Sequence, residues 1–485
     1  MRVALIFPKV AESIADGSLT SLEKKNWLTN QVKTHLFGFG ETNFIPPMVL
    51  LSLASVTPAS VDLIVVDERI QDVDFDMDVD LVGISVITLT AFRAYYIASR
   101  FRERGIPIVF GGIHPTVLPA EALQYGDAVV VGEGEGIWPQ LLRDASVGAL
   151  KKIYRADTAI PLELLPSPRL DLLPHPERYV TTKVVRATRG CPYGCTFCTV
   201  GTPAGWIYRK RPIRDIVRDI GPHPGKYMFF LDDNLGVDMD YAKNLFRAVK
   251  PLNLKWYGSV SIDALEDCDF IEAAADSGCK FFGIGFESLS KHTLKAMGKL
   301  KTNNPDRYKE IIRRVHEHEI AIVGYFLMGY DTDVPEDYDQ LAEFLLETGI
   351  EIPSISALTP YPGAPITRKL EREGRILHRR WNLYYDRWWD LAYEPKTMTP
   401  QEIFESYLKM MDRVFSLRPV IRRSLPHVRR RNPIALTYIL QHGYDKQKTL
   451  KAEKTYQQKI FTSGLHTPQS HSLPANYLAD SDIGF

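Results

Sequence analysis

The chain has 485 residues, too many for one ordinary domain, and its 45% hydrophobic and 24% charged residues are typical of a globular protein. Lys plus Arg and Asp plus Glu are equal at 59 each, so the overall charge favours neither nucleic acid nor an anionic membrane as a partner. The five cysteines are odd in number and clustered, which argues against a disulfide framework and for a reducing compartment. The start, MRVALIFPKV, has no long apolar signal region, and no window is apolar enough to span a membrane. We therefore expect a cytoplasmic protein.

Strand and helix signals alternate over residues 1–145. The strand candidates are continuous apolar runs, as expected for strands that are buried on both faces of a parallel sheet. They lie at residues 2–7, 61–67, 80–88, 107–112 and 127–135, with helix candidates at 91–104 and 119–123. This pattern predicts a doubly wound α/β domain, Rossmann or flavodoxin-like, whose ligands bind beyond the carboxyl ends of the strands.

Residues 146–179 are rich in proline and aperiodic, and we interpret them as a linker. A second α/β alternation follows over residues 180–375. Its strand candidates are 183–188, 227–233, 255–261, 280–288, 321–329 and 352–360, and its helix candidates are 213–220, 240–249, 267–277, 304–318 and 334–348. Six β-α repeats make about three quarters of an eight-fold barrel, which takes about 250 residues. The sequence therefore predicts a partial (β/α)6 barrel.

The pattern changes again after the barrel. Residues 376–442 are expected to form a small, mostly helical region, with an amphipathic helix at 400–417. The aromatic residues within 381–389 either line an apolar pocket or cap the barrel as ordinary core. Arginines gather in 418–433, which suits a peripheral contact with anionic lipid headgroups, a solvated face or a phosphate clamp. Residues 443–485 are polar and weakly patterned, and we expect a frayed tail.

Three of the five cysteines, Cys191, Cys195 and Cys198, stand in the stretch TRGCPYGCTFCTV after the first barrel strand. Three thiolates cannot complete a structural zinc site, which takes four ligands, and no histidine is near in the sequence. Thiolates suit an iron–sulfur cluster, and a four-iron cluster with three cysteines leaves one iron open to a substrate-like ligand. The odd count therefore favours catalysis. A redox dithiol with a spectator, or a zinc loop completed from elsewhere, are the alternatives.

The C-x-x-x-C-x-x-C spacing, Phe197 before the last cysteine and the predicted partial barrel resemble the radical S-adenosylmethionine (SAM) superfamily. Further stretches within about 180–375 look like successive strand-end motifs of one branch: FFLDDN, WYGSVSID, GIGFES, FLMGYDTD and LTPYPGAP. In that family the cysteines hold a 4Fe–4S cluster whose open iron chelates the amino and carboxylate groups of SAM. One-electron reduction then releases a 5′-deoxyadenosyl radical, which abstracts hydrogen from an unactivated carbon. The resemblance implies that Cys191, Cys195 and Cys198 bind this cluster and that Phe197 lies by the cofactors.

Polar side chains at strand ends are candidates for the SAM pocket, because SAM carries an ammonium, a sulfonium and two ribose hydroxyls. These candidates are Asp232, Asp233, Asn234, Ser259, Ser261 and Glu287. The first three end one strand, and the resemblance makes them the family's amino-group motif. The two serines are expected on one face of the next strand, and Glu287 would meet ribose hydroxyls or the methionine end. The alternatives are a turn or helix start at 233–234 and a surface acid at 287.

The first domain resembles the cobalamin-binding domain of one large branch, in the stretch GISVIT…VFGGIHPTVLPAEAL…DAVVVGEGE. By this resemblance Ser85, Gly111 and Gly112 bind the cofactor at strand ends, where glycine permits close backbone approach. The stretch DERIQD (67–72) departs from one cobalamin pattern, Asp-x-His-x-x-Gly, because it lacks the axial histidine and the glycine. Cobalamin is commonly held without a protein histidine in this branch. His114 is a candidate ligand, with a turn residue or hydrogen-bond donor as the alternative. A domain that keeps only the fold is the alternative to cobalamin binding.

Taken together, the resemblances imply a radical SAM enzyme, most simply a cobalamin-dependent methyltransferase that acts on an unactivated carbon of a hydrophobic small molecule, hopanoid-like or tetrapyrrole. The radical would take a hydrogen, methylcobalamin would deliver the methyl group, and a second SAM would remethylate the cobalamin. The expected partners are that substrate and an external one-electron reductant such as flavodoxin or ferredoxin, with no nucleic acid.

Three other functions compete. Cyclisation, oxidation or rearrangement of a similar substrate needs no methyl transfer, and a non-catalytic cobalamin or metal sensor needs no reaction at all. A methylthiotransferase acting on RNA is disfavoured, because its family uses three further cysteines in the N-terminal domain and no cysteine precedes Cys191 here. Localisation is expected to be cytoplasmic, with membrane association through 418–433 as an option.

Overall fold

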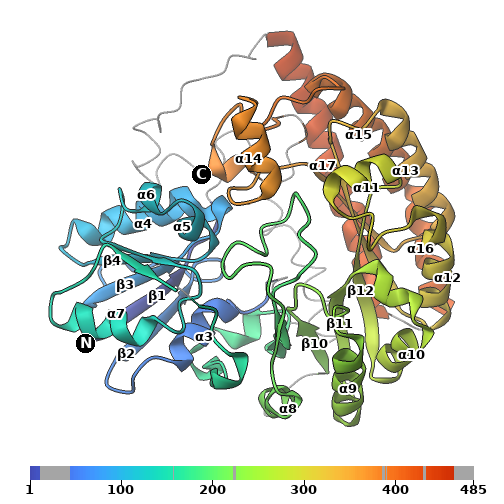
Figure 1. Ribbon diagram of the computed structural model, residues 1–485. Coiled ribbons are helices and arrows are strands. Elements are labelled where there is room, and N and C mark those ends of the chain that lie inside the picture. Colours follow the sequence, from blue (N-terminus) through green and yellow to red (C-terminus); the bar gives the residue numbers. More distant parts are fainter. Residues whose placement is uncertain are drawn as a thin grey trace.

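The computed structural model describes residues 1–10, 44–156, 158–221, 226–384, 388, 390–429 and 433–463. Two parallel sheets, one from each half of the chain, lie side by side (Figure 1). Within the described ranges, no helix is both long and apolar enough to cross a membrane.

The N-terminal domain is built on a six-stranded parallel sheet with the order β2-β1-β3-β4-β5-β6. Its strands are β1 (Arg2–Phe7), β2 (Asp62–Asp67), β3 (Leu81–Ser85), β4 (Ile108–Gly111), β5 (Ala128–Val131) and β6 (Ile153–Arg155). Its helices are α3 (Met48–Ser55), α4 (Ala91–Arg102), α5 (Ile113–Val117), α6 (Pro119–Ala122) and α7 (Trp138–Ser146). The order 2-1-3-4-5 is that of the flavodoxin-like doubly wound fold, which confirms the predicted fold class.

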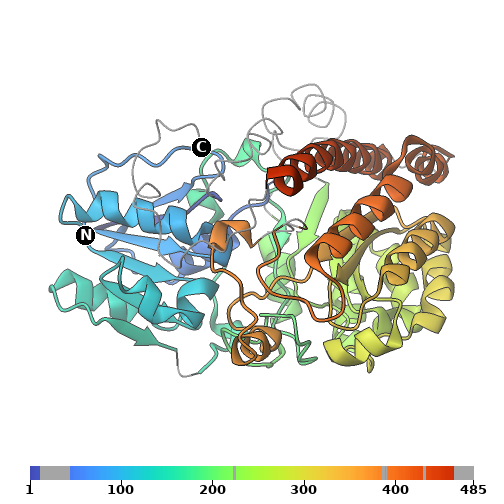
Figure 2. The ribbon, with the colours of Figure 1, turned by 90° about the horizontal axis from the view of Figure 1, so that it is seen from above.

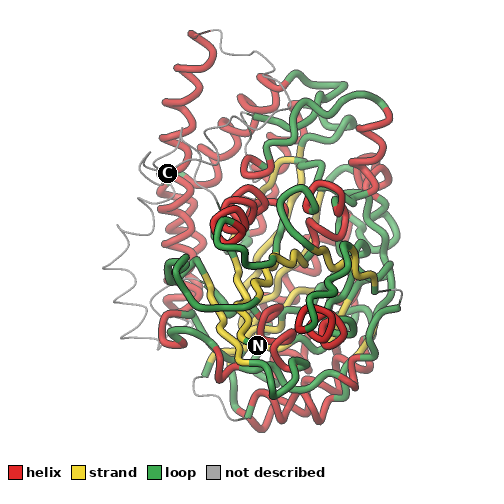
Figure 3. Tube along the Cα trace, turned by 90° about the vertical axis from the view of Figure 1, so that its left-hand side faces the viewer, coloured by secondary structure: helices red, strands yellow, loops and turns green. Residues whose placement is uncertain are grey.

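Helices cover both faces of this sheet (Figure 3, strands in yellow and helices in red). On one face, α4 contributes Tyr95 and Phe101 to a core shared with β3 and β4. On the other face, α3 and α7 contribute Leu50 and Trp138 to a second core. Because both faces are buried, every residue of β5 is apolar and buried.

The segment predicted as a linker, 146–179, contains the last strand of this sheet. β6 pairs in parallel with β5, so the first sheet extends to Arg155. The strand is only three residues long and alternates exposed, buried and exposed, so it gives too short a pattern to stand out from its surroundings.

The second domain is an open barrel of parallel strands in the order β14-β13-β12-β11-β10-β7. The strands are β7 (Val184–Val185), β10 (Tyr227–Phe230), β11 (Lys255–Val260), β12 (Cys279–Glu287), β13 (Ala321–Met328) and β14 (Ile352–Ala357). The helices between them are α8 (Ile213–Ile220), α9 (Met239–Val249), α10 (Cys268–Asp276), α11 (Lys291–Met297), α12 (Tyr308–Glu317) and α13 (Pro335–Thr348), and α14 (Pro365–Arg372) follows β14. A short antiparallel ribbon, β8 (Thr188–Arg189) with β9 (Arg209–Lys210), flanks the loop after β7. The six-stranded order confirms the predicted partial barrel.

Three C-terminal helices complete the barrel: α15 (Pro400–Phe415), α16 (Leu417–Arg429) and α17 (Pro433–Ser463). Figure 2 shows the long α17, in dark red, lying along the barrel beside the other two. Its Tyr438 and Ile439 pack against the inner face of the barrel, where the Phe281 and Tyr438 rings lie 6.0 Å apart. The C-terminal helices thus fill the inner face near the start of the strands, and the carboxyl ends of the strands are left for the site.

The predicted tail, 443–485, is wrong in its first half, because α17 continues to Ser463. The helix was hidden in the sequence because its buried positions are sparse: Gly443 packs on Val420, and Leu450 is the next buried apolar residue. Residues 464–485 lie outside the described part of the chain.

The aromatic segment after the barrel is core wherever it is described. Trp381 and Tyr384 pack into the N-terminal domain, and the Trp381 Nε1–H donates to Glu121 at 2.8 Å. Trp388 stacks on Tyr407 with ring centroids 4.1 Å apart. The remaining positions, 385–387 and 389, lie outside the described residues. The structure therefore favours ordinary core over a pocket lining for these rings.

Candidate functional site

The cysteine loop begins directly after β8 and is fixed by its backbone. Gly190 has a φ of 85°, and a Cβ there would lie 2.0 Å from the Ile207 carbonyl oxygen, so only glycine fits. Thr196 donates its N–H to the Met297 carbonyl, 3.0 Å away, and accepts from the Ile366 N–H at 2.8 Å. The loop that carries the three cysteines is thereby held between α11 and α14.

All three thiols are partly or largely buried, and burial raises their pKa, that of Cys198 to about 11. The positive charge of Lys299 acts against this rise at Cys191 and Cys195. Thiolates bind metal, so a bound cluster must supply the missing positive charge. In the described residues no three His, Cys, Asp or Glu side chains converge on one metal ion. A cubane cluster needs no such convergence, since each cysteine binds a different iron.

Two of the three polar residues after β10 are used to join strands. Asp232 is buried and accepts from the Thr188 hydroxyl at 2.6 Å and the Ala187 N–H at 3.2 Å; its burial raises its pKa to about 6. Asn234 accepts from the Ser261 N–H at 2.9 Å and donates to the Ser261 hydroxyl at 2.9 Å. Asp232 and Asn234 were predicted to hold the SAM ammonium, but both side chains already have hydrogen-bond partners within the protein.

Asp233 differs from its neighbours because it is exposed beside the cysteine loop. It accepts from the Gly190 N–H at 2.9 Å, one residue before Cys191. Of the three acceptors predicted at this strand end, it is the carboxylate placed to receive a cation next to the cysteines. Phe197 lies in the same loop and packs partly buried against the barrel core.

Ser259 and Ser261 were predicted on one face of β11, and only Ser259 belongs to the strand, which is Lys255–Val260. Ser259 follows the strand alternation and lies on the inner face, 3.3 Å from the Tyr257 hydroxyl. β11 ends at Val260, and Ser261 turns toward Asn234 as a one-turn helix begins at Ile262. Ser261 thus lies just past the strand, where its bonds to Asn234 join the ends of β10 and β11.

Glu287 ends β12 in a strained backbone conformation, with a φ of 63° and an irregular register to β13. Its carboxylate lies 3.5 Å from the Lys299 ammonium, and both side chains are largely buried. A Cβ on Gly285 would lie 2.4 Å from the Glu287 Oε1, so glycine at 285 leaves space for this carboxylate. Burial raises the pKa of Glu287, although Lys299 acts to lower it. Burial also acts to lower the pKa of Lys299, but Glu287 and the nearby cysteines outweigh this effect, so the pKa of Lys299 is raised. Lys299 was not predicted, because nothing in its sequence setting distinguishes it from a surface lysine.

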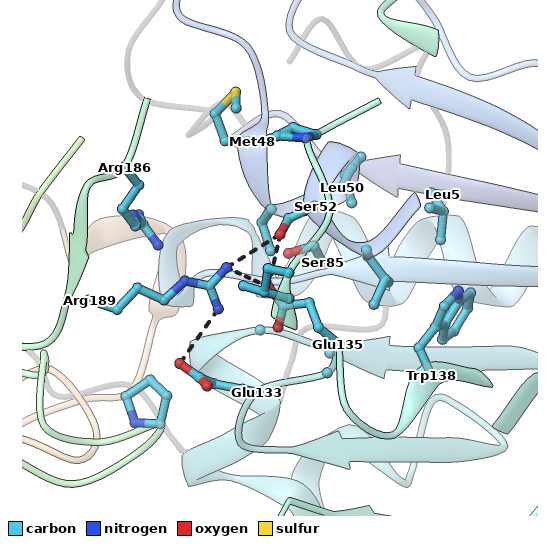
Figure 4. A pocket seen from close by; sticks show the side chains of 18 of the residues that line it. Leu5, Met48, Leu50, Ser52, Ser85, Glu133, Glu135, Trp138, Arg186 and Arg189 are labelled. Carbon is cyan, nitrogen blue, oxygen red and sulfur yellow. Dashed lines mark hydrogen bonds and ion pairs between the residues drawn. The ribbon is translucent and has the colours of Figure 1, made fainter. Parts of the chain in front are cut away.

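A cavity of about 290 Å³ lies where the carboxyl ends of the N-terminal strands face the barrel (Figure 4). Ser85, Gly111 and Gly112, all predicted for cobalamin, line it. Gly112 has a φ of 100°, and a Cβ there would lie 2.7 Å from the Val86 carbonyl oxygen. The cavity continues between the sheet and its helices, lined by Leu5, Leu50, Gly83, Val109, Val130 and Trp138. Glycines at the rim and an apolar interior fit a large planar cofactor with an inserted base.

One wall of this cavity is ionic and joins the two domains. Arg189 donates to Glu135 at 2.6 Å, and Glu135 also accepts from the Ser52 hydroxyl at 3.0 Å. Arg209, which faces Arg189 across the ribbon, donates to Glu133 at 2.9 Å. Burial acts to raise the pKa of Glu135, but Arg189 outweighs it and lowers that pKa. Because Gly190 and Cys191 follow Arg189, this wall leads directly into the cysteine loop. These residues were not predicted; the quoted stretch VVGEGE contains both glutamates, but their arginine partners lie far along the chain.

His114 does not lie where a cobalamin ligand is expected. It is fully buried, its Nε2 lies 3.1 Å from the Tyr95 hydroxyl and 3.3 Å from Glu121, and it is not among the residues that line the cavity. The short helix α5 turns the His114 ring into the domain core, which favours the alternative role of a hydrogen-bonding residue over that of a ligand. In the stretch 67–72, which departs from the Asp-x-His-x-x-Gly pattern, Asp67 forms an ion pair with Arg69 at 2.6 Å.

Comparison with known proteins agrees with both halves of the site. Residues 185–345 match the Radical SAM superfamily model, and residues 47–142 match the B12 binding domain model. The chain is 31% identical to a bacteriochlorophyllide d C-12(1)-methyltransferase of Chlorobaculum tepidum, over 85% of this chain and 93% of that one. It is 25% identical to the hopanoid C-2 methylase of Rhodopseudomonas palustris, over 69% of this chain and 66% of that one.

A solved structure shares the whole architecture. The cobalamin-dependent SAM radical enzyme OxsB, with aqua-cobalamin and SAM bound, superposes with a TM-score of 0.62 over 98% of this chain and 82% of that chain, at 13% identity. The radical SAM domain confirms the predicted 4Fe–4S cluster and SAM, and the B12 binding domain confirms the predicted cobalamin. With its cysteine loop and cobalamin-type cavity adjoining, the chain belongs to the cobalamin-dependent methyltransferases of the radical SAM superfamily.

Proposed function

We propose that this enzyme methylates an unactivated carbon of a tetrapyrrole. The observation that carries the proposal is the single cavity wall that runs from Ser85 and Gly112, at the N-terminal strand ends, through Glu135 and Arg189 to the cysteine loop. A methyl carrier in the cavity and a radical source on the loop would then meet at one substrate. When bound, the cluster supplies the electron that splits SAM to a 5′-deoxyadenosyl radical, and cobalamin carries the methyl group.

The chain's own residues bind and orient SAM and keep water away from the radical. Asp233 offers an exposed carboxylate for the SAM ammonium beside the cysteines. Lys299 adds a buried positive charge next to the same sulfur atoms and suits the SAM carboxylate. Glu287, released from Lys299 in that case, can accept from ribose hydroxyls at the end of β12. The C-terminal helices close the inner face behind them and keep water from the radical.

A second cleft, of about 570 Å³, is the reason to propose a tetrapyrrole with a free carboxylate as the substrate, rather than a hydrocarbon lipid. It adjoins the first cavity, since both are lined by Thr116, Gly132 and Pro203. Arg155 at the end of β6 and Arg368 of α14 stand on its walls. Among the described residues neither guanidinium has a carboxylate partner, whereas the nearby Glu371 binds Arg379 at 2.8 Å. Two unpaired guanidinium groups at a cavity entrance suit a carboxylate on a large apolar ring.

The test is methyl transfer from SAM with a deuterated methyl group. Enzyme reconstituted with iron, sulfide and cobalamin is incubated anaerobically with a chlorophyllide or, in parallel, with a hopene. We expect a labelled methyl group in the chlorophyllide by mass spectrometry, together with 5′-deoxyadenosine and S-adenosylhomocysteine. Formation of 5′-deoxyadenosine with an oxidised or cyclised, unlabelled product would contradict methyl transfer, and a labelled hopene alone would contradict the substrate class.

The carboxylate site can be tested in the same assay. Arg155→Gln and Arg368→Gln should each raise the KM for the chlorophyllide by about tenfold, the worth of one charge-assisted hydrogen bond. Their iron and cobalt contents should not change. Arg313→Gln, an exposed arginine on α12, is the matched control. An unchanged KM in both variants would remove the structural support for a carboxylate-bearing substrate.

A further inference from the structure

We propose that α16 lies in the headgroup layer of an anionic membrane and thereby docks the enzyme on a lipid surface. The helix runs from Leu417 to Arg429 and packs against α15 and α17. Around its axis it divides into three faces: one buried, one exposed and apolar, and one basic. This division is independent of the substrate, and it goes beyond the proposed methyl transfer.

The buried face attaches the helix firmly to the protein. Val420, Ser424 and His427 are buried along one side, at a helical spacing of about one turn. The His427 Nε2 lies 2.8 Å from the carboxylate of Glu351, just before β14. A helix held this way presents its other faces in a fixed orientation.

The second face is a stripe of large apolar side chains in solvent. Leu417, Ile421, Leu425 and Val428 are 68%, 46%, 51% and 56% exposed. Their spacing of four, four and three residues puts them on one line along the helix. A stripe of this kind on a surface helix costs free energy in water and marks a contact with an apolar phase or partner.

The third face supplies the charge that selects the partner. Three exposed arginines form this face: Arg418, Arg422 and Arg429. Each directly follows a residue of the apolar stripe, which places it about 100° further around the helix axis. The helix contains no acidic residue, LRPVIRRSLPHVR. An apolar stripe flanked by arginines is the arrangement of helices that lie in the plane of an anionic bilayer, with the arginine heads at the phosphates.

The surrounding chain extends the same charge. Residues 417–454 contain ten Lys and Arg but only two Asp and Glu, in a protein whose net charge is zero. The rest of the chain is therefore acidic on balance, which orients the molecule with this region toward a negative surface and works against non-specific attraction elsewhere. Charge complementarity thus points to anionic lipid as the occupant of the stripe.

The test is co-sedimentation of the full-length holoenzyme with vesicles of phosphatidylcholine alone or mixed with phosphatidylglycerol. We expect binding to the mixed vesicles that falls with salt, and little binding to phosphatidylcholine. The double variant Ile421→Asp, Leu425→Asp should abolish binding. Arg418→Gln with Arg422→Gln should weaken it by about 25-fold, since each basic residue near the surface contributes about fivefold.

Matched controls separate docking from damage to the fold. Val147→Asp places an acid on an apolar side chain that is 76% exposed in the other domain, and Arg313→Gln removes an exposed arginine elsewhere. Both controls should bind vesicles as the wild type does. Equal loss in controls and α16 variants, or no binding of the wild type, would overturn the proposal. So would a dimer in solution that the α16 variants alone dissociate, because the stripe would then belong to a second copy of the chain.

Discussion

Asp232, Asp233 and Asn234 are consecutive, yet the fold gives them unequal freedom. The outer two are buried in hydrogen bonds that tie β10 to the strands beside it, whereas Asp233 is exposed and bound only to the Gly190 N–H among the described contacts. A strand that has just ended twists its last side chains in turn toward the sheet and toward the loop, so neighbours in sequence need not share a role.

Asp233→Asn should therefore weaken SAM binding by about tenfold to a hundredfold, the worth of a charge-assisted hydrogen bond, and leave the iron content unchanged. Equilibrium binding to the reconstituted protein measures the first quantity and iron analysis the second. Asp240→Asn, on an almost fully exposed side chain of α9, is the control. Unchanged SAM affinity in Asp233→Asn would show that another group receives the ammonium.

At residue scale the sequence was informative where a residue type is rare and poor where it is common. The three cysteines, Glu287 and Gly112 stand in motifs whose chemistry can be stated from the residues. Lys299 and Arg189 are ordinary basic residues, and their importance comes only from burial beside acidic partners brought from elsewhere in the chain. For His114 both a ligand role and a hydrogen-bond role were open, because the two look alike in sequence, and the structure shows it bonded to Tyr95.

At the scale of elements, one buried carboxylate fastens the C-terminal helix α16 to the barrel. Glu351 accepts from the Ile322 N–H at 2.9 Å and lies 3.1 Å from the His316 Nε2 and 2.8 Å from the His427 Nε2. Burial acts to raise the pKa of Glu351, but the two histidines outweigh it and lower that pKa to about 2. The carboxylate thus stabilises the fold as long as it is ionised.

Because the folded pKa lies below the unfolded value, this contribution is complete above about pH 4.5 and is lost as the pH falls toward 2. Glu351→Gln should destabilise the protein by about 2–3 kcal/mol at neutral pH, since it leaves the buried His427 and the half-buried His316 with a weaker partner. It should also flatten the acid dependence of the melting temperature, followed by circular dichroism. Glu347→Gln, on an exposed glutamate of α13, is the control. A wild-type acid dependence retained in Glu351→Gln would contradict this role.

Most of the elements could be predicted because their hydrophobic patterns are long. Each of the six parallel barrel strands and α8, α9, α10, α12 and α13 lies within a few residues of its predicted range. Among the elements that were missed, β6 has only three residues, and the described part of α17 buries few apolar side chains. For such elements the contacts made across the fold outweigh the local pattern.

At the scale of the whole molecule, function depends on how the two sheets meet. Arg189 and Glu135 are 54 residues apart in the chain, and Trp381 reaches Glu121 across 260 residues. Pairings at that distance have no periodicity to read, so the sequence predicted both domains and their cofactors but not the shared cavity. The aromatic segment was predicted either to line a substrate pocket or to be ordinary core, and its described residues Trp381 and Tyr384 join the C-terminal region to the first domain.

The central claim is that cobalamin occupies this cavity beside the cluster, and one substitution tests it directly. Gly111 lines the cavity, and a Cβ there would meet nothing closer than Val130 at 3.9 Å, so Gly111→Phe would fill the space without disturbing the strand. Gly136→Phe is the control, since Gly136 has open space and does not line the cavity.

The measurement is the iron and cobalt content of protein reconstituted anaerobically with iron, sulfide and cobalamin. The wild type and Gly136→Phe should each retain about four iron atoms and about one cobalt per chain. Gly111→Phe should retain the iron and lose the cobalt. Full cobalt retention in Gly111→Phe, or a wild type that binds iron but no cobalt, would contradict the account.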